Sequence, residues 1–319
     1  MKAMVTALVS VFFLLSGQVY AQAYPAKPIR FVVPYPAGTS LDVLGRMIVD
    51  EVRRTTGAVV VVDNKPGAFG IIGTDSVVKS APDGYTIMIS SSASHSSAPQ
   101  LVKATSYDPI KDFTHIGKAH TFESVLAVNS SSRFKVLNDL ITEARANPDK
   151  LTYGYGSTTS QVVSASFLRA AGIKLRGIPY KGQPQAMTDL LGGQVDMMAA
   201  DVGLSLAQAK AGKIRPLAVA AARRVPQYPS TPTLGELGVN DVEISGWTGL
   251  SGPAGMPRES IAWWADNLKA ALAQKSQYDR LLDMGFGPDF LGPDAFPEFV
   301  KAQLAVWEKH VRAAGMKPE

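Results

Sequence analysis

Two turns rich in glycine and hydroxyl side chains are the parts of this sequence best suited to hold an anion. Residues 36–40 read Pro-Ala-Gly-Thr-Ser, and residues 156–160 read Gly-Ser-Thr-Thr-Ser. Each turn follows a short apolar run and precedes a segment with helical spacing, which predicts a strand, a turn and a helix. The first N–H groups of such a helix have no intrahelical acceptor and favour negative charge. Both turns are therefore candidate sites for an anion.

The candidate ligand contacts of these turns share backbone donors, hydroxyls or a position at the strand end. They are Tyr35, Ala37, Gly38, Thr39, Ser40, Gly156, Ser157, Thr158, Thr159 and Ser160. Asp42 is ambiguous, because an acidic residue in the first turn stabilises its own helix and repels an anion. We interpret Asp42 first as a structural cap, although it could meet a ligand ammonium group.

Three further places in the chain supply polar side chains after a predicted strand. Residues 90–97 form a serine-rich stretch in which Ser92 and Ser94 are neutral donors and His95 is either structural or cleft-lining. Tyr180 follows a proline, and both packing and cleft lining fit it. Asp201 at a strand end could receive a ligand amine or hydroxyl, or it could cap the helix that follows.

Enzyme motifs are missing from the sequence. The four histidines, His95, His115, His120 and His310, show no metal-ligand spacing, and there is no cysteine. There is no Gly-x-Ser-x-Gly elbow and no phosphate-binding loop with Lys-Ser/Thr. A Ser94, His95 and Asp201 triad is the remaining catalytic alternative, but any chain of this size supplies such triples. We expect no catalytic residues, no metal and no cofactor.

The N-terminus indicates export. Lys2 precedes an apolar run from Val5 to Leu15, and Ala21-Gln22-Ala23 is a small-x-small cleavage site, which together predict a signal peptide over residues 1–23. A protein without cysteine has no disulfides, which suits a bacterial periplasm. The formal net charge is +5, but the basic residues are scattered, so no nucleic-acid partner is expected.

Strands and helices alternate along the mature chain, which predicts an α/β fold with mostly parallel, doubly wound sheets. The two similar turns lie far apart in sequence and suggest two lobes that share a cleft. We expect lobe 1 to comprise residues 24–124 and 225–319, and lobe 2 residues 125–224. The four tryptophans are expected to be packing residues rather than an aromatic cage.

Several motifs lie in order along nearly the whole mature chain, in segments 24–30, 34–46, 63–68, 81–86, 179–182, 189–196, 210–215, 247–250 and 253–257. They resemble the motifs of the substrate-binding proteins of tripartite tricarboxylate transporters, the Bug-type receptors. The resemblance implies a periplasmic binding protein of type II, with two lobes that close on a small carboxylate for delivery to integral membrane permease subunits. It also maps the family's binding turns onto residues 36–40 and 156–160.

Two departures from the family pattern lie in the turns. The family commonly has Gly-Gly where this chain has Gly38-Thr39, and it usually has a second glycine and a later histidine in the second turn. The added hydroxyls and bulk alter the pocket, so di- and tricarboxylates, aromatic acids and related organic acids all stay open as ligands. Neither turn contains arginine, which predicts a carboxylate held by N–H groups, hydroxyls and water. A ligand sensor for a signalling partner and a secreted hydrolase are the alternative functions.

Overall fold

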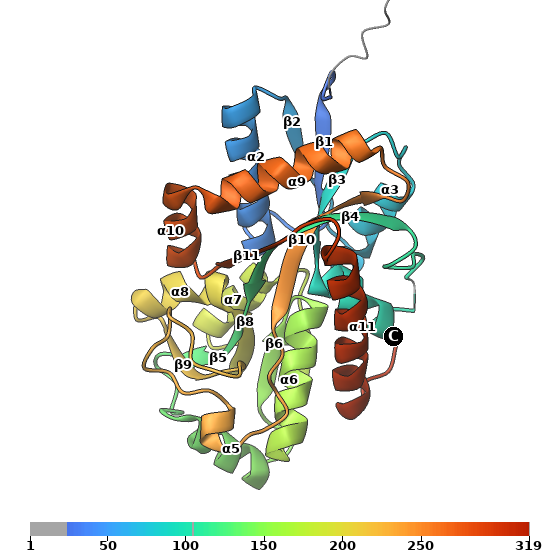
Figure 1. Ribbon diagram of the computed structural model, residues 1–319. Helices are drawn as coiled ribbons and strands as arrows, with labels where there is room; N and C mark the ends of the chain where they lie inside the picture. Colours follow the sequence, from blue (N-terminus) through green and yellow to red (C-terminus); the bar gives the residue numbers. More distant parts are fainter. Residues whose placement is uncertain (1–23, 104, 319) are drawn as a thin grey trace, which may run out of the picture.

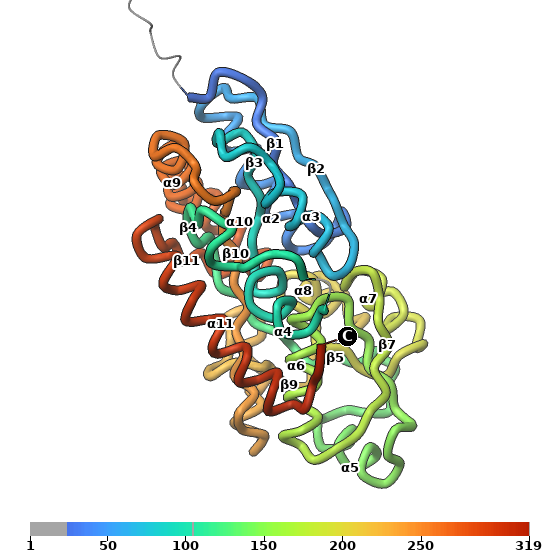
Figure 2. The backbone as a smooth tube through the Cα atoms, turned by 90° about the vertical axis from the view of Figure 1, so that its right-hand side faces the viewer, coloured from blue at the N-terminus to red at the C-terminus, as the bar shows by residue number. Residues whose placement is uncertain are grey.

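The computed structural model describes residues 24–103 and 105–318, so the predicted signal peptide lies outside the described residues. The chain forms two lobes, each built on one β-sheet flanked by helices, and the lobes lie one above the other (Figures 1 and 2). The N-terminal segments and helix α9 (Arg258–Ala273) belong to the upper lobe in Figure 1, whereas helix α5 (Leu137–Ala146) lies at the far end of the lower lobe.

Lobe 1 is built on a six-stranded sheet. Its strands are β1 (Ile29–Val33), β2 (Val60–Asn64), β3 (Thr86–Ser91), β4 (Phe113–Phe122), β10 (Gly246–Pro253) and β11 (Gly287–Leu291). Its helical segments are α2 (Ser40–Thr56), η1 (Ala68–Gly70), α3 (Ile71–Val78), η2 (Ala93–Ser97), α4 (Ala98–Leu101), α9, α10 (Lys275–Asp283) and α11 (Phe296–Ala313). The sequence did not predict β11, because Pro288 and Asp289 interrupt an otherwise short apolar run.

Lobe 2 is built on a five-stranded sheet. Its strands are β5 (Ser124–Asn129), β6 (Thr152–Tyr155), β7 (Arg176–Pro179), β8 (Met197–Asp201) and β9 (Ile214–Val219). Its helical segments are α5, α6 (Thr158–Ala171), α7 (Gln183–Leu191), α8 (Val202–Lys210) and η3 (Gly235–Leu237). The predicted strand, turn and helix at each binding turn are therefore present, as β1–α2 and β6–α6.

Five strands follow the same order in the two sheets, and lobe 1 adds β11 at one edge, so the lobes are topological repeats over these five strands. The order is β11-β4-β10-β3-β1-β2 in lobe 1 and β9-β5-β8-β6-β7 in lobe 2. In each sheet a parallel trio (β2, β1, β3 or β7, β6, β8) is followed by an antiparallel strand (β10 or β5). The sheets are therefore mixed: four strands of each run in the same direction, whereas β10 and β11 in lobe 1 and β5 in lobe 2 run the opposite way. The chain enters lobe 2 on β5 and returns to lobe 1 on β10.

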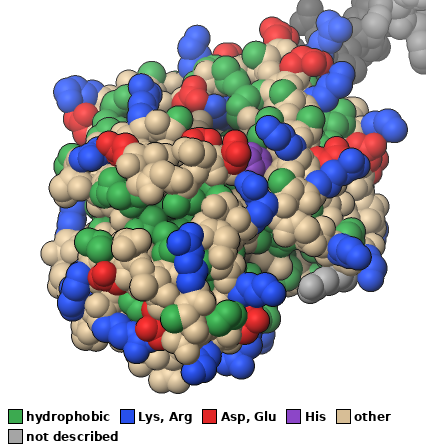
Figure 3. Space-filling view, turned by 90° about the horizontal axis from the view of Figure 1, so that it is seen from below, with side chains coloured by type: hydrophobic (Ala, Val, Ile, Leu, Met, Phe, Trp, Pro, Cys, Tyr) green, Lys and Arg blue, Asp and Glu red, His purple; other side chains and the backbone are tan. Residues whose placement is uncertain are grey.

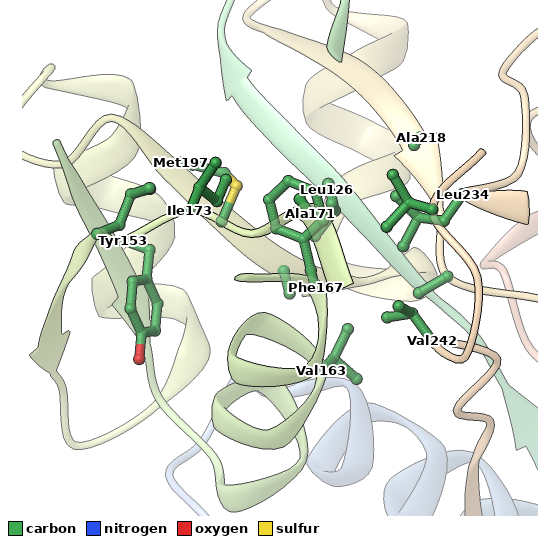
Figure 4. Close-up of a cluster of buried hydrophobic side chains, with 14 of the residues drawn as sticks. Leu126, Tyr153, Val163, Phe167, Ala171, Ile173, Met197, Ala218, Leu234 and Val242 are labelled. Atoms are coloured by element: carbon green, nitrogen blue, oxygen red, sulfur yellow. The ribbon is translucent and has the colours of Figure 1, made fainter. Parts of the chain in front are cut away.

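The crossings between the lobes lie side by side. Glu123 links β4 to β5, and Ser245 precedes β10 on the return, where its hydroxyl donates to Glu123 Oε1 at 2.8 Å. The predicted return at residue 225 is about twenty residues too early, because residues 225–244 stay with lobe 2. Leu234 and Val242 pack with Phe167 in the lobe 2 core (Figure 4), and the Leu234 N–H donates to the Val219 carbonyl at 3.0 Å. These residues lack the regular alternation of a strand, so only packing assigns them to a lobe.

Helix α11 ties the two lobes together. Phe296 and Val300 near its start pack with Trp247 of β10, whereas Trp307 and Val311 near its end join the core cluster of lobe 2. Figure 1 shows this helix running from the upper lobe down beside α6. Trp247, Trp264 and Trp307 are buried, which agrees with the expected packing role.

The surface carries charges of both signs. Lys and Arg side chains are interspersed with Asp and Glu over the face seen from below (Figure 3). Within the described part of the chain, no helix has the length and hydropathy needed to cross a bilayer.

Candidate functional site

A small cavity lies between the lobes at the ends of several strands. Its volume is about 30 Å³, which is room for one or two water molecules. The lobes are thus in contact around this cavity, which has no room for a larger molecule in this arrangement. The lining residues are Tyr35, Pro36, Thr39, Leu41, Ser91, Ala93, Phe122, Gly156, Ser157, Thr159, Gly182, Gln183 and Asp201.

The N-terminal ends of four helices meet at this cavity. Thr39, Ser157, Gly182 and Asp201 occupy the N-cap positions of α2, α6, α7 and α8, and all four line the cavity. A helix N-terminus carries roughly half a positive charge and unpaired N–H groups. One of these helices belongs to lobe 1 and three to lobe 2. The cavity is therefore an electropositive site that both lobes complete.

The first turn, residues 36–40, is held by hydrogen bonds with Asp42 in the first turn of α2. Thr39 caps α2 by accepting from the Asp42 N–H at 3.2 Å, and the Gly38 N–H donates to Asp42 Oδ2 at 3.0 Å. Arg46 Nε and Asn64 Nδ2 also donate to Asp42, at 2.9 and 2.8 Å. Burial opposes ionisation, but these bonds outweigh it and lower the pKa of Asp42. Asp42 thus makes bonds within the protein and lies outside the cavity lining.

Not every predicted residue of the first turn faces the cavity. Ala37 and Gly38 are exposed at the tip of the turn and do not line it. Gly38 has φ +80°, a backbone conformation that favours glycine. The Ser40 hydroxyl is buried without a partner, and it too lies outside the lining. Tyr35 and Thr39 are the predicted residues of this turn that line the cavity.

The second turn is capped by hydroxyl groups and carries no acid. Ser157 Oγ accepts from the Ser160 N–H at 3.1 Å, and the Ser157 N–H donates to Ser160 Oγ at 3.2 Å. Gly156, Ser157 and Thr159 line the cavity, whereas Ser160 and Thr158 lie behind it. Gly156 must be glycine, because a Cβ there would lie 2.1 Å from the carbonyl carbon of Gly182.

The second turn also contacts the serine-rich stretch of lobe 1. Thr158 Oγ1 lies 2.6 Å from Ser97 Oγ and donates to the Ala93 carbonyl at 3.2 Å. Thr159 Oγ1 lies 3.3 Å from Ser92 Oγ. These buried hydroxyl pairs close the lobes on each other, so Ser92 contributes to closure and lies beside the cavity lining.

Ser94 and His95 belong to the core of lobe 1. Ser94 Oγ lies 2.9 Å from His95 Nδ1, and both residues are completely buried outside the cavity lining. The His95 ring packs among Phe113, His115 and Trp247, and burial lowers its pKa well below the usual value. Among the described residues no acidic side chain bonds to His95. The Ser94, His95 and Asp201 triad is therefore not assembled.

Asp201 lies in the cavity wall at the end of β8. Its backbone N–H donates to Gln183 Oε1 at 3.1 Å, and Gln183 Nε2 donates to Ser157 Oγ at 3.3 Å. Burial raises the pKa of Asp201 to about 6. Gln183 is a lining residue that the sequence did not identify. The signal was available, since residues 176–183 form another strand and turn before a helix.

An outer groove of about 730 Å³ lies beside the cavity and shares Pro36 with it. Tyr180 lines this groove, with its hydroxyl donating to Asp189 Oδ2 at 2.7 Å. Phe69 lines it as well, and its ring stacks on Tyr155 of lobe 2 with centroids 6.3 Å apart. Phe69 has φ +54°, a conformation uncommon outside glycine. The sequence did not single out Phe69.

The chemistry available in the cavity is hydrogen bonding by neutral groups around one acid. No Lys, Arg or His is among the described residues that line it, and no cluster of potential metal ligands occurs in the described part of the chain. The donors are helix N–H groups, hydroxyls and the Gln183 amide. Such a set suits a small anion that the two lobes enclose together.

Comparison with known proteins agrees with this geometry. Residues 44–316 match the model of the tripartite tricarboxylate transporter family receptor. The chain is 31% identical to protein BugT of Bordetella pertussis, over 98% of this chain and 97% of that protein.

Solved structures give the same picture. Rpa4515 of R. palustris with adipate has a TM-score of 0.90 and 31% identity, over 93% of this chain and all of that one. MatC of Rhodopseudomonas palustris with bound malate has a TM-score of 0.85 and 26% identity, over 90% of this chain and all of that one. These likenesses confirm the predicted two-lobed α/β fold of a periplasmic binding protein. Together with the match over residues 44–316, they show that the chain belongs to the Bug-type receptor family of tripartite tricarboxylate transporters.

Proposed function

We propose that this protein is a periplasmic receptor that captures a small organic carboxylate between its lobes and delivers it to integral membrane permease subunits. The observation that carries the proposal is the meeting of four helix N-termini, from both lobes, at one cavity without Lys or Arg. The relatives crystallised with adipate and malate support the ligand class. The proposal places the protein in the periplasm after removal of residues 1–23, and it assigns no catalysis to it.

The energy of binding requires both lobes. A micromolar affinity needs about 8 kcal/mol net, after association and ordering costs of order 4–15 kcal/mol. A charge-assisted hydrogen bond contributes roughly 1.5–3 kcal/mol, so two or three bonds from one turn are insufficient. Ligand contact with α2 and α6 together links binding to closure, and the closed form is the state a permease can recognise.

A ligand panel tests the proposal. The mature protein is heated with mono-, di- and tricarboxylates, aromatic acids and acidic amino acids, and the melting temperature is recorded for each. A ligand at about one hundred times its Kd adds roughly 2.7 kcal/mol, which raises the melting temperature by several degrees. Thr159→Val, which removes a lining hydroxyl, should reduce the shift, whereas the exposed change Lys150→Gln should leave it intact. A panel without any shift would contradict the proposal.

Delivery to a permease is separable from sensing. The liganded receptor should bind detergent-solubilised permease subunits of the tripartite type more tightly than the ligand-free receptor does. Ligand-dependent capture of a signalling protein in place of the permease would favour the sensor alternative. Hydrolysis of esters or amides that Ser94→Ala abolishes would favour the hydrolase alternative, which the buried position of Ser94 opposes.

A further inference from the structure

Among the residues that the structure describes, one oxygen of the Asp201 carboxylate, in the wall of the cavity, has no hydrogen-bond partner. The side chain is buried, with 8% of its surface exposed, and its Oδ1 atom is completely buried and unpaired. Asp201 occupies the N-cap position of α8, yet its side chain makes no capping bond to that helix. The structure therefore removes the capping role that the sequence allowed. A buried carboxylate oxygen without a protein partner is costly, so it is available to accept a hydrogen bond from a group that enters the cavity.

The surroundings favour an ionised Asp201 at neutral pH. Although burial raises its pKa, the value of about 6 stays below the pH of a neutral medium. Asp201 begins α8, and the N-termini of α6 and α7 end at the same cavity, so positive helix ends face it. Across the cavity the titratable neighbour is Tyr35, whose pKa is raised by burial and, to a smaller extent, by the Asp201 charge. No cationic side chain of the described lining neutralises the carboxylate.

An organic acid that has no hydroxyl or ammonium group does not complement the cavity wall at Asp201. Its negative charge fits the N-termini of α6 and α7, whose first turns carry no acid, but the Asp201 carboxylate repels any second anion in the same small space. A group that donates a hydrogen bond removes this conflict by pairing with Oδ1. An ammonium group adds charge attraction to the bond, and a hydroxyl group supplies the bond alone.

We propose that the ligand is a carboxylic acid that carries an ammonium or hydroxyl group beside its carboxylate, and that Asp201 selects it by accepting a hydrogen bond from that group. The inference rests on the proposed function and narrows its ligand class. The carboxylate lies at the hydroxyl-lined helix ends, and the donor lies at the end of β8. Acids without a donor leave Oδ1 unpaired and bind more weakly.

Matched sets of acids test this selection. Succinate, malate and aspartate share one carbon chain and differ in a hydrogen, a hydroxyl or an ammonium group, and glutarate, 2-hydroxyglutarate and glutamate form a second set. Dissociation constants are measured by titration calorimetry with the mature protein at pH 7.5. In at least one set the donor-bearing acid should bind about tenfold tighter or more than its unsubstituted partner. The hydroxyl and ammonium members tell which donor the site prefers.

Variants at Asp201 attribute the preference to this side chain. Asp201→Asn keeps the shape and removes the charge, so the preference should fall to within about twofold and the unsubstituted acid should bind more tightly than to the native protein. Asp201→Ser provides a second variant should the first fold poorly. Asp266→Asn, at an exposed position on α9, is the matched control and should keep the native preference. Circular dichroism and the melting temperature verify that each variant is folded.

The outcomes separate this inference from the function on which it rests. Equal binding of the unsubstituted and substituted acids by the native protein would overturn the inference and leave the receptor function standing. An unchanged preference of Asp201→Asn for the donor-bearing acids would also overturn it, because a group other than Asp201 would then bind the donor. Failure of every carboxylate in the wider panel would overturn the proposed function, and the inference with it.

Discussion

The two lobes use the same strand–turn–helix unit, but the backbone N–H groups of the turn donate to different side chains in each lobe. In lobe 1, Asp42 reaches back to the Gly38 N–H and is itself held by Arg46 and Asn64. In lobe 2, Ser157 and Ser160 exchange hydroxyl bonds, and the first turn of α6 contains no acidic residue. The lobe 1 turn thus carries its own counter-charge, whereas the lobe 2 turn leaves its positive helix end open to a ligand. We call lobe 1, whose turn is held by Asp42, the braced half, and lobe 2, whose turn at residues 156–160 has no acid, the receptive half.

The glycines of the two turns differ in the same way. Gly38 has φ +80°, and a Cβ there would meet no atom within 4 Å. Gly156 has no positive φ, but its Cβ would collide with the backbone of Gly182 and Gln183 at 2.1 and 2.2 Å. One glycine is required for its backbone conformation and the other for space. The shared sequence pattern hides two separate constraints.

The largest expected effect comes from exchanging these glycines for alanine. Gly156→Ala should lower the free energy of unfolding by about 3 kcal/mol or more, because backbone rather than a flexible side chain blocks the new methyl group. Gly38→Ala should cost only about 1–2 kcal/mol, the strain of a left-handed alanine. Urea denaturation measures both. Gly38→Asn should recover part of the loss, and equal costs for the two alanine variants would contradict the proposed difference.

The second largest effect is expected from replacing Asp42, the acidic residue that holds the lobe 1 turn. Asp42→Asn should lower stability at pH 7 by about 2–3 kcal/mol, since bonds from Arg46 and Gly38 lose their charged acceptor. The folded pKa of Asp42 lies below its usual value of 3.8. Its stabilising contribution is therefore present above pH 3.8 and is lost as the pH falls through the folded pKa.

The pH dependence identifies this contribution. The difference in unfolding free energy between the native protein and Asp42→Asn should shrink as the pH falls below 4. Asp50→Asn, at an exposed position of the same helix, serves as the control. A difference that stays constant down to pH 3 would argue against ionised Asp42 as the brace.

Glu123, which links β4 to β5 where the chain crosses between the lobes, should make the stability of the protein depend on pH. Burial raises the pKa of Glu123 to about 7, from a usual value of 4.5. Protonation thus stabilises the folded protein below pH 4.5, and this contribution is lost as the pH rises through 7. Glu123→Gln should match the native protein at pH 4 and exceed it by about 2 kcal/mol at pH 8. Thermal melts across this range check the crossover, with the exposed Glu298→Gln as control; parallel curves would refute it.

The smallest effects come from the caps. Thr39→Ala and Ser157→Ala should each cost about 1 kcal/mol of stability. Ser157→Ala should additionally weaken ligand binding more than Thr39→Ala does, because Ser157 also holds the Gln183 amide in the receptive half. Denaturation and calorimetry on the same preparations compare the two. A larger loss of affinity for Thr39→Ala would reverse the assignment of the braced and receptive halves.

Local patterns in the sequence predicted much of the site. Hydroxyl and glycine residues after apolar runs located both turns, and the family motifs identified the two-lobed fold. The sequence did not predict the lobe boundary, because residues 225–244 pack on lobe 2 mostly as irregular segments around the short helix η3. Placing His95 was also beyond local reasoning, because the rings that bury it come from β4 and β10.

The sequence by itself determined the α/β class, the family, and the two strand–turn–helix units, because propensity, capping and periodicity act within a few residues. The tertiary structure alone decided which side chains of those units face one cavity. It separated Thr159 and Asp201, which line the cavity, from Gly38 and Ser94, which do not. The physical reason is that the direction of a side chain at a lobe interface depends on strand order and lobe closure, which bring together residues more than one hundred positions apart.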